Sequence, residues 1–350
     1  MNGTIYDFSG LPRVATLPAD LPVRATTRLR AVPAPERAPG RIGMITNPRS
    51  HRNKRGRGES LPRADLLTAA PRSRAELRDV LRRFAAERLD LLVIDGGDGT
   101  VRDVLTCAED AWGPAWPRLA VLPSGKTNAL ALDLGVPNGW TLDQALAAAR
   151  SGRIATRSPI EIARRGEPGV IVRGFLFGAG AFVAATALAQ RTHRAGAFNG
   201  VAVGATLAGA IGQTFFGSRT GEWRRGERMR VRHDARSAAI HGAMLESDRA
   251  DYLLLASTLE RLPLGVRPFG EVRPGLKTLS IEAPPRRMLA AVPALLGGSE
   301  AGWLERAGYH RVDAPATDLD LDGRFILDGE IFPAGSYRLV EAAPLSFVVP

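Results

Sequence analysis

The sequence has little of what cross-links small secreted proteins or reads nucleic acids. Its 350 residues include one cysteine, Cys107, so an internal disulfide is excluded, and this favours a reducing cytoplasm. Aromatic residues make up only 6% of the chain, with no zinc-finger spacing and no aromatic RNA-binding motif, so we expect no nucleic-acid partner. No basic segment followed by an apolar core opens the chain, so a secretion signal is not expected.

Strongly apolar runs of membrane-spanning length are also missing. The long uncharged stretch at residues 198–216 is mostly alanine and glycine, whereas a transmembrane helix needs about 20 strongly apolar residues. We expect a helix of a second domain there. It either touches the bilayer, walls an acyl-chain pocket or packs in the core.

Acidic residues are outnumbered by basic ones. The chain has 47 Lys and Arg against 36 Asp and Glu, which gives a net charge of +11 and indicates an anionic partner. The arginines are spread along the whole length and do not form a basic tail. We therefore expect a peripheral association with the acidic inner face of a membrane.

The composition is that of a folded, two-domain protein. Hydrophobic residues make up 45% of the chain, and its length suits two cores. Residues 1–40 are proline-rich and form a predicted extension. Strands alternate with helices over 41–155, which predicts a parallel α/β sheet of Rossmann type. Strands, among them predicted ones at 154–162 and 170–177, dominate 156–350, which predicts a β-sandwich whose last strands, within 338–349, return to the first domain.

The most informative motif follows a predicted buried strand at residues 91–94. Gly96, Gly97 and Gly99 permit positive φ and let a ligand approach the backbone, while Thr100 is placed to cap the helix that follows. Free amides and the positive end of that helix favour a phosphate.

Asp98 stands inside this glycine turn. A carboxylate beside a polyanion is repulsive unless it binds a bridging cation or takes a proton from a substrate hydroxyl. The pattern therefore favours kinase chemistry over simple nucleotide binding. The alternative is a scaffold turn whose aspartate only hydrogen-bonds the loop.

Two further turns follow predicted strands. Residues 119–122 lead into Ser124-Gly125-Lys126-Thr127-Asn128, and residues 41–46 lead into Asn47-Pro48-Arg49-Ser50 and the basic stretch 52–58. Turns at the carboxyl ends of parallel strands can face one crevice. A P-loop is excluded, because Ala120 stands where that motif needs glycine. The basic stretch closes over a nucleotide, leans on anionic lipid or is a solvated loop.

In this order the motifs resemble the diacylglycerol kinase catalytic-domain family, which includes sphingosine and ceramide kinases. The matching residues are Asn47-Pro48 with Ser50, Gly96-Gly97-Asp98-Gly99-Thr100, Pro123 to Asn128 with Leu134-Gly135, and Asp328-Gly329-Glu330. NAD kinases and phosphofructokinases share the glycine signature. An NAD kinase is expected to carry Asn-x-Gly-x-x-Gly-Phe where this chain has residues 124–128.

The resemblance implies that ATP lies between two domains and that a lipid primary hydroxyl attacks its γ-phosphate. The residues implied in nucleotide binding are Asn47, Pro48, Ser50, Thr68, Gly96, Gly97, Gly99, Thr100, Ser124, Gly125, Lys126, Thr127 and Asn128. The implied catalytic residues are Asp98, Asp328 and Glu330. Asp98 holds Mg²⁺ or orients the hydroxyl, and either Asp98 or Glu330 is the base.

Several positions depart from the family pattern. Lys126 stands where many members have a threonine hydroxyl, and its cation can neutralise ATP charge. Residues 267–280 lack the aspartate of a structural magnesium site, so we expect no such metal, and a ceramide or another long-chain substrate stays possible. Asp328-Gly329 also reads as an ordinary hairpin turn. The alternatives are an NAD-kinase-like small-molecule kinase and a non-catalytic lipid or nucleotide sensor.

Overall fold

The computed structural model describes residues 40–50, 53, 66–166, 171–186, 226–234 and 246–350. The helix predicted at 198–216, most of the basic stretch 52–58 and all but the last residue of the predicted extension 1–40 lie outside the described residues. The chain divides into two compact units. The first comprises Met1–Ala163, Glu167–Phe175 and Ala342–Pro350, and the second comprises Arg164–Gly166 and Leu176–Glu341.

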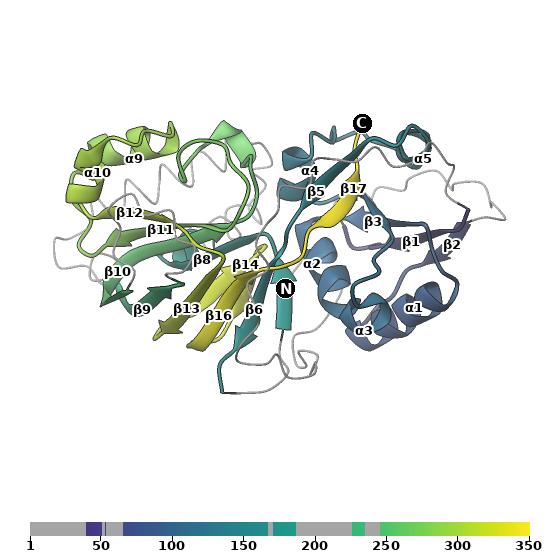
Figure 1. The fold of residues 1–350 in the computed structure, drawn as a ribbon, viewed down its shortest axis with the longest axis horizontal. Helices are drawn as coiled ribbons and strands as arrows, with labels where there is room; N and C mark the ends of the chain where they lie inside the picture. Colours follow the sequence, from purple (N-terminus) through teal and green to yellow (C-terminus); the bar gives the residue numbers. More distant parts are fainter. Residues whose placement is uncertain (1–39, 51–52, 54–65, 167–170, 187–225, 235–245) are drawn as a thin grey trace. The chain divides into compact units, whose positions relative to one another are not determined.

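The first unit is built on a mixed sheet with the strand order β2-β1-β3-β4-β17-β5 (Figure 1). Its strands are β1 (Ile42–Thr46), β2 (Leu66–Ala69), β3 (Leu91–Gly96), β4 (Arg118–Pro123), β5 (Ile154–Arg157) and β17 (Leu345–Val348). Strands β1 to β4 and β17 are parallel, whereas β5 runs antiparallel to β17.

Helices cover both faces of this sheet. Figure 1 shows α1 to α3 on one side and α4 and α5 on the other. Their bounds are Arg74–Ala86 for α1, Asp98–Cys107 for α2, Glu109–Trp112 for α3, Ala129–Asp133 for α4 and Leu142–Arg150 for α5. Leu91 to Ile94 are fully buried, as a strand covered on both faces requires. The predicted Rossmann-like class is confirmed.

Local sequence explains where these helices begin. Ser73 caps α1 by accepting a hydrogen bond from the amide of Glu76, and Thr141 forms a capping box with Gln144 at the start of α5. On α1, Leu77, Leu81 and their apolar neighbours at helical spacing are buried.

The strand order places a topological switch in the first unit. From β1 the chain passes to β2 on one side and then returns to β3 on the other. In open α/β sheets, ligands bind at the carboxyl ends of the strands beside such a switch point. The residues that follow β1 and β3 are therefore the first place to look for a site.

The second unit is dominated by antiparallel strands in the order β15-β14-β8-β10-β9-β13-β16, with β11 pairing β10 and β12 pairing β11. The strands are β8 (Leu176–Gly180), β9 (Glu227–His233), β10 (Glu246–Ser257), β11 (Lys277–Glu282), β12 (Tyr309–Asp313), β13 (Ala316–Leu321), β14 (Phe325–Leu327), β15 (Glu330–Phe332) and β16 (Gly335–Glu341). Short helices in the described part of this unit include η2 (Pro263–Gly265), α9 (Met288–Leu296) and α10 (Gly302–Arg306). The β-rich class predicted for this part of the chain is confirmed.

One face of the second sheet is apolar and the other is charged. On β9, Met229 and Val231 point into the core, whereas Arg230 and Arg232 alternate with them and pair with Asp248 and Asp318. A cluster of aromatic rings around Phe325 fills the core, with centroid separations of 4.9–5.0 Å to the rings of Phe177, Phe332 and Tyr337.

Two predicted strands are broken where they were expected to continue. The strand predicted over 154–162 divides at Ser158-Pro159 into β5 and β6 (Ile160–Arg164), because proline has no N–H for a ladder. The strand predicted over 170–177 divides at Phe175 into β7 (Ile171–Gly174) and β8. Strands β6 and β7 pair antiparallel. Among the described residues, no helix is long and apolar enough to cross a membrane.

Candidate functional site

Three turns come together at the carboxyl edge of the first sheet. Strands β1, β3 and β4 are neighbours, with Thr46 opposite Asp95 and Gly96 opposite Pro123. The turns that follow these strands therefore lie next to one another. They contain Asn47 to Ser50, Gly97 to Thr100 and Ser124 to Asn128.

The two glycine turns pack backbone against backbone. A Cβ built on Gly97 would lie 2.8 Å from the Cα of Gly125, and the amide of Ser124 donates to the carbonyl of Gly96 at 3.0 Å. A Cβ on Gly96 would lie 2.4 Å from Cβ of Thr100. Gly97 has φ of −97°, and Gly96 and Gly99 are not among the described glycines with positive φ. The positive φ that these glycines permit is not adopted, and close approach of the backbone is what requires glycine at Gly96 and Gly97.

Asn47 connects the first turn to helix α2. Its side chain is buried, and Nδ2 donates to Oγ1 of Thr100 at 2.9 Å. Its Oδ1 accepts from the amide of Arg49 at 2.9 Å, which closes an Asx turn. Thr100 lies in the first turn of α2, whose N-cap is Gly97 without a side-chain cap. The predicted capping role of Thr100 is therefore wrong, because its hydroxyl meets the Asn47 amide instead.

A residue outside the predicted set, Asp95, joins the second and third turns. Asp95 is 3% exposed, and its carboxylate accepts a short hydrogen bond from Oγ of the fully buried Ser124. Its carbonyl also accepts from the amide of Asn47 at 2.9 Å. The sequence could have indicated this role, because Asp95 directly follows the apolar run at residues 91–94. A carboxylate buried there requires a hydrogen-bonding partner.

Asn128 shapes the turn that carries it. Its φ is +52°, a conformation that asparagine tolerates better than most residues. Its Oδ1 accepts from the amide of Gly125 at 2.9 Å, and its Nδ2 donates to the carbonyl of Gly125 at 3.1 Å. Lys126 and Thr127 are exposed at the tip of this turn. These two side chains are therefore the ones in the turn that are available to a ligand.

Asp98 begins helix α2 and contacts the start of α4. Its Oδ1 accepts from the amide of Leu130 at 3.2 Å. Burial raises the pKa of Asp98 above its usual value, and hydrogen bonds from amides that include those of Ala129 and Leu130 oppose this rise only in part. A carboxylate with a raised pKa is a stronger base.

The described residues contain no group of three or more His, Cys, Asp or Glu side chains that could hold a metal ion. Mg²⁺ usually keeps several waters and takes one or two carboxylates together with substrate phosphates. Asp98 fits such a site, because Mg²⁺ held in this way can take a single carboxylate from the protein.

The other predicted nucleotide residues have differing positions. Ser50 is buried and its amide donates to the carbonyl of Asn47 at 3.1 Å, whereas Pro48 is exposed. Thr68 lies on the edge strand β2, opposite Met44 in the body of β1. It is therefore not part of the three turns.

The predicted catalytic residues of the last motif belong to the second unit. Asp328 and Gly329 have φ of +45° and +82°, and Leu327 pairs with Glu330 across them. This is a two-residue hairpin with the type I′ signature. Asp328 is latched to β8, because its Oδ1 accepts from the amide of Leu176 at 2.9 Å and its amide donates to the Leu176 carbonyl at 2.9 Å. Glu330 is 8% exposed.

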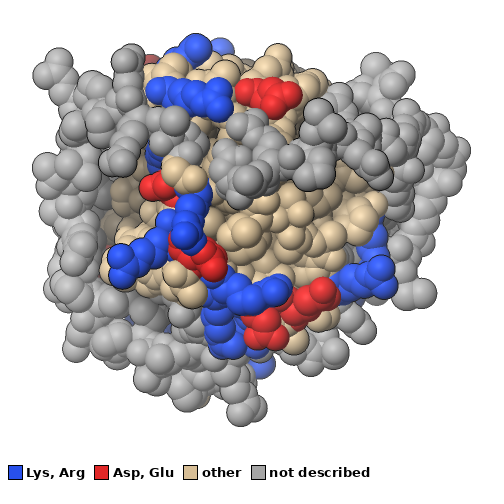
Figure 2. Space-filling model, turned by 90° about the vertical axis from the view of Figure 1, so that its right-hand side faces the viewer, with Lys and Arg blue, Asp and Glu red and all other residues tan. Residues whose placement is uncertain are grey.

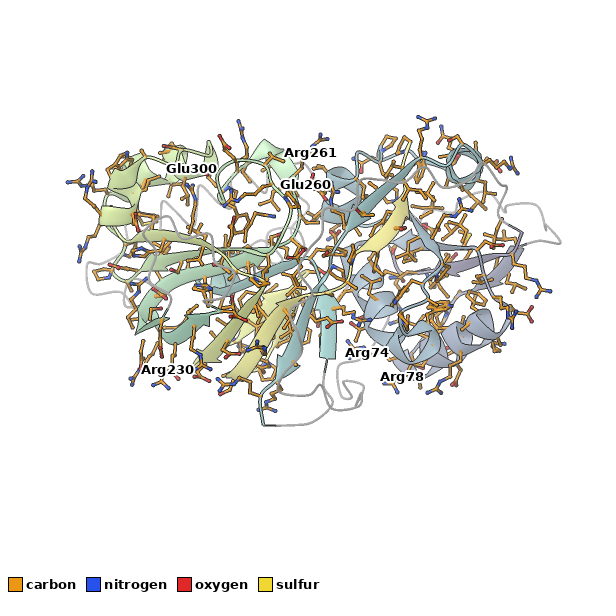
Figure 3. All side chains as sticks on the ribbon, in the orientation of Figure 1. Arg74, Arg78, Arg230, Glu260, Arg261 and Glu300 are labelled. Atoms are coloured by element: carbon orange, nitrogen blue, oxygen red, sulfur yellow. The ribbon has the colours of Figure 1, made fainter. Side chains whose placement is uncertain are left out.

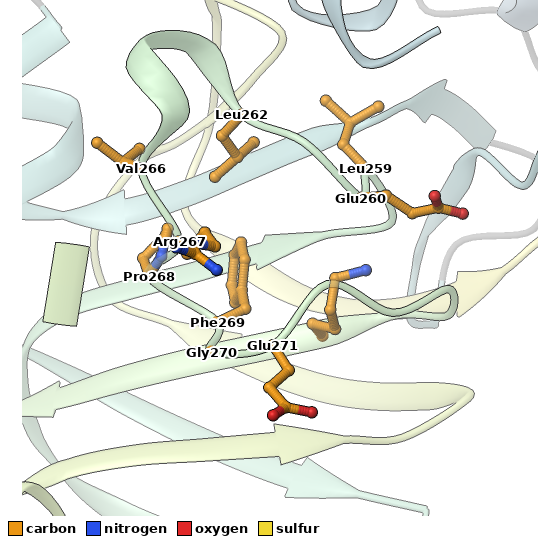
Figure 4. Close-up of a pocket in the computed structure, with 10 residues that line it drawn as sticks. Leu259, Glu260, Leu262, Val266, Arg267, Pro268, Phe269, Gly270 and Glu271 are labelled. Atoms are coloured by element: carbon orange, nitrogen blue, oxygen red, sulfur yellow. The ribbon is translucent and has the colours of Figure 1, made fainter. Parts of the chain in front are cut away.

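A shallow pocket lies elsewhere in the second unit (Figure 4). The loop of η2 forms much of its wall, with Leu262, Val266 and Phe269 among the lining residues. Lys277 also lines it, although this side chain is 2% exposed, and its Nζ donates to the carbonyls of Arg273 and Gly275 at 3.0 and 2.9 Å. No residue of the three turns lines this pocket.

The chain therefore belongs to the class of proteins that combine an α/β unit, here with polar turns at the carboxyl ends of its parallel strands, with a second unit of antiparallel strands. Residues 44–162 match the family described as Diacylglycerol kinase catalytic domain. The resemblance found in the sequence motifs is confirmed.

Solved structures share the fold across both units. A crystal structure of a diacylglycerol kinase from Bacillus anthracis strain Sterne is 14% identical, with a TM-score of 0.56 over 89% of this chain and 97% of that one. Another from the same organism, described as a provisionally assigned diacylglycerol kinase, is 15% identical, with a TM-score of 0.59 over 90% of this chain and 98% of that one. No curated protein sequence matches this chain as a relative.

Proposed function

We propose that the protein is an ATP-dependent lipid kinase, which transfers the γ-phosphate to the primary hydroxyl of a membrane lipid of the diacylglycerol or ceramide and sphingoid type. One observation carries this proposal. Asp98, with its raised pKa, lies in a glycine turn that packs against a second turn, within the residues that match the diacylglycerol kinase catalytic domain. A peripheral location on an anionic membrane is part of the proposal, in keeping with the net charge of +11.

The side chains of the three turns divide into two groups. Three side chains of the turns are buried and form hydrogen bonds within the protein, so they set the shape of the turns. The pairs are Asn47 with Thr100, Ser124 with Asp95, and Asn128 with Gly125. Lys126 and Thr127 are exposed and are the proposed contacts to phosphate oxygens. A lysine there acts as a point charge that offsets the charge of the triphosphate.

ATP would supply the phosphoryl group, and Mg²⁺ would neutralise charge on its phosphates. Asp98 would hold the metal through water or accept the proton of the attacking hydroxyl. Glu330 is the other proposed base. Phosphoryl transfer needs little covalent help from the protein, so either carboxylate would act mainly by positioning.

The testing experiment is transfer of labelled γ-phosphate from ATP and Mg²⁺ to mixed micelles. Separate reactions contain diacylglycerol, ceramide, sphingosine or no lipid, and NAD serves as a soluble acceptor. Labelling of one lipid, lost in Asp98→Asn while ATP binding persists, is the expected result. Labelling of NAD without lipid would replace the proposal with an NAD-kinase-like activity.

A non-catalytic lipid or nucleotide sensor is the second candidate. The observation that favours it is the engagement of Asp98 by the amide of Leu130, which already satisfies one carboxylate oxygen. Measurable ATP binding without labelling of any acceptor would support the sensor and contradict the kinase.

A further inference from the structure

Helix α9 has no polar side chain, although part of it faces solvent. Its sequence, Met288 to Leu296, is Met-Leu-Ala-Ala-Val-Pro-Ala-Leu-Leu. Met288, Ala291 and Leu295 form its buried face, whereas Leu289 is 74% exposed and Pro293 is exposed beside it. A helix that is apolar on all sides is normally enclosed by protein or lipid. The outward face of α9 is therefore not explained by packing within the unit.

A second exposed leucine lies in the neighbouring loop. Leu264, in the η2 turn, is 57% exposed and has φ of +63°, a conformation unfavourable for a bulky residue. The loop has an inner layer of its own, since Leu262 and Phe269 are 8% and 4% exposed and line the pocket of Figure 4. Leu264 is therefore not needed to cover that pocket.

The loop and the helix are fastened together. The amide of Arg267 donates to the carbonyl of Leu296 at 2.8 Å. From β12, the guanidinium of Arg311 donates to the carbonyl of Pro268 at 2.8 Å and to that of Ser299 at 2.6 Å. We refer to the exposed apolar residues of this assembly, Leu264, Leu289, Ala290 and Pro293, as the apolar platform.

Arginines adjoin both parts of the platform in sequence. Arg261 and Arg267 flank the η2 turn, and Arg286 and Arg287 directly precede α9, and all four are exposed. The N-terminus of a helix disfavours cations, and the first turn of α9 has no acidic residue to offset them. An anion at this end of the helix would stabilise Arg287, which is the N-cap residue of α9.

The acidic neighbours are partly engaged already. Oε1 of Glu300 accepts from the amide of Glu271 at 3.1 Å and lies 3.8 Å from the guanidinium of Arg273. Figure 3 shows Glu260 close to Arg261 on the same side of the unit. Glu271 is exposed. Arg267 and Arg287 are thus exposed next to an apolar surface.

We propose that the apolar platform docks the protein on an anionic lipid bilayer, with Leu264 and Leu289 entering the interface and the four arginines contacting lipid phosphates. Apolar insertion combined with basic flanks is the physical signature of interfacial binding. The inference rests on the proposed function, since a lipid kinase must reach a substrate held in a membrane. It concerns a surface of the second unit, and no catalytic residue takes part in it.

The test is co-sedimentation of the full chain with vesicles of phosphatidylcholine, with or without phosphatidylglycerol. Binding to the anionic vesicles and weaker binding at high salt are expected. Leu264→Glu and Leu289→Glu should each lower the partition coefficient by about tenfold or more, because each removes one leucine from the interface. Arg286→Ala with Arg287→Ala should weaken binding and reduce its dependence on salt.

Matched controls come from the first unit. Leu67, 38% exposed on β2, and Arg82, 57% exposed at its side chain on α1, offer Leu67→Glu and Arg82→Ala. Both control variants should bind like the unchanged protein. Equal binding by all variants, or no binding by the unchanged protein, would overturn the proposal. Thermal unfolding of every variant checks that the second unit is folded.

Two further readouts separate the possible failures. Phosphorylation of a short-chain, water-soluble diacylglycerol should persist in Leu289→Glu, because the platform serves only docking. Vesicle binding by a protein that phosphorylates no acceptor would contradict the proposed function but would still support docking through the apolar platform. Light scattering tests the rival occupant, a second copy. A dimer that Leu289→Glu dissociates, without vesicle binding, would make the platform a self-association surface and overturn the proposal.

Discussion

Gly97 and Gly125 approach so closely that a Cβ on Gly125 would lie 2.5 Å from the Cα of Gly97. The two residues belong to turns that follow neighbouring parallel strands, and they are 28 positions apart in the chain. Their contact fixes the spacing between the start of α2 and the turn that carries Lys126. The shape of the proposed phosphate site therefore depends on the absence of a Cβ atom at both positions.

Gly125→Ala is expected to damage both stability and nucleotide binding. The new methyl group would meet the Gly97 backbone and, at 2.8 Å, Oδ1 of Asn128, so the turns must separate. Overpacking of this kind costs about 1–3 kcal/mol in the free energy of unfolding. Urea denaturation and ATP binding measure the two effects. Gly139→Ala is the matched control, because nothing lies within 4 Å of its added Cβ, and equal losses in both variants would contradict the argument.

Asn128→Ala should destabilise the protein without removing any charge from the site. The change leaves the amide and the carbonyl of Gly125 without their side-chain partners and puts alanine at φ of +52°. The expected loss is roughly 1–3 kcal/mol in the free energy of unfolding. Lys126→Ala is the counterpart. This side chain is exposed, so its removal should leave unfolding unchanged and raise the KM for ATP.

The raised pKa of Asp98 predicts a sign for its effect on stability. Burial favours the protonated form, so the folded protein binds this proton more tightly than the unfolded chain does. The contribution of Asp98 to stability is fully present below its unfolded pKa of 3.8 and is lost as the pH rises through the raised folded value. Urea unfolding from pH 4 to pH 8 should show a steeper loss in the unchanged protein than in Asp98→Asn.

The same substitution should abolish phosphoryl transfer. Burial disfavours the ionised form of Asp98, and an asparagine has no charge to bury, so the Asp98→Asn variant is expected to be at least as stable as the unchanged protein while it loses activity. A variant that stays active would exclude Asp98 as base and as metal ligand. One that unfolds would show that the hydrogen bond to the amide of Leu130 is structural.

The sequence predicted the sheet and its turns because those signals are local. The apolar run Leu91 to Ile94 followed by glycines indicates a buried strand and a tight turn without reference to the rest of the chain. The partner of each polar side chain was not predictable in this way. Thr100 meets Asn47, and Ser124 meets Asp95, only because parallel pairing places β1 and β4 on either side of β3.

Charge patterning was harder to interpret from composition alone. The net charge of +11 indicates an anionic partner but does not locate a surface. In the described part of the face drawn in Figure 2, acidic side chains lie beside basic ones and do not leave a uniform basic patch. The platform of α9 depends on exposure at Leu289 and Leu264, and exposure is a property of the tertiary fold.

Lys277→Met should destabilise the second unit. The ammonium group of Lys277 is enclosed and donates to two backbone carbonyls in the stretch 267–280, where the sequence predicted no structural magnesium. Loss of these donors is expected to cost about 1–3 kcal/mol, because the carbonyls lose bonds that they cannot replace. Thermal unfolding measures the change, and EDTA should leave the Tm of the unchanged protein unaltered. A large effect of EDTA would instead indicate a metal in this unit.

Substitutions of Asp328 and Glu330 are expected to have opposite effects on stability and on kcat, although the two residues are only two positions apart. Asp328 occupies a left-handed turn position and holds the amide of Leu176, and asparagine can do both, so Asp328→Asn should keep its fold and its activity. Asp328→Ala should lower the free energy of unfolding by about 1–2 kcal/mol. Glu330→Gln should leave unfolding nearly unchanged and lower kcat if Glu330 is the base. Steady-state kinetics beside urea denaturation distinguish these results, and a loss of kcat in Asp328→Asn at unchanged stability would assign chemistry to the aspartate instead.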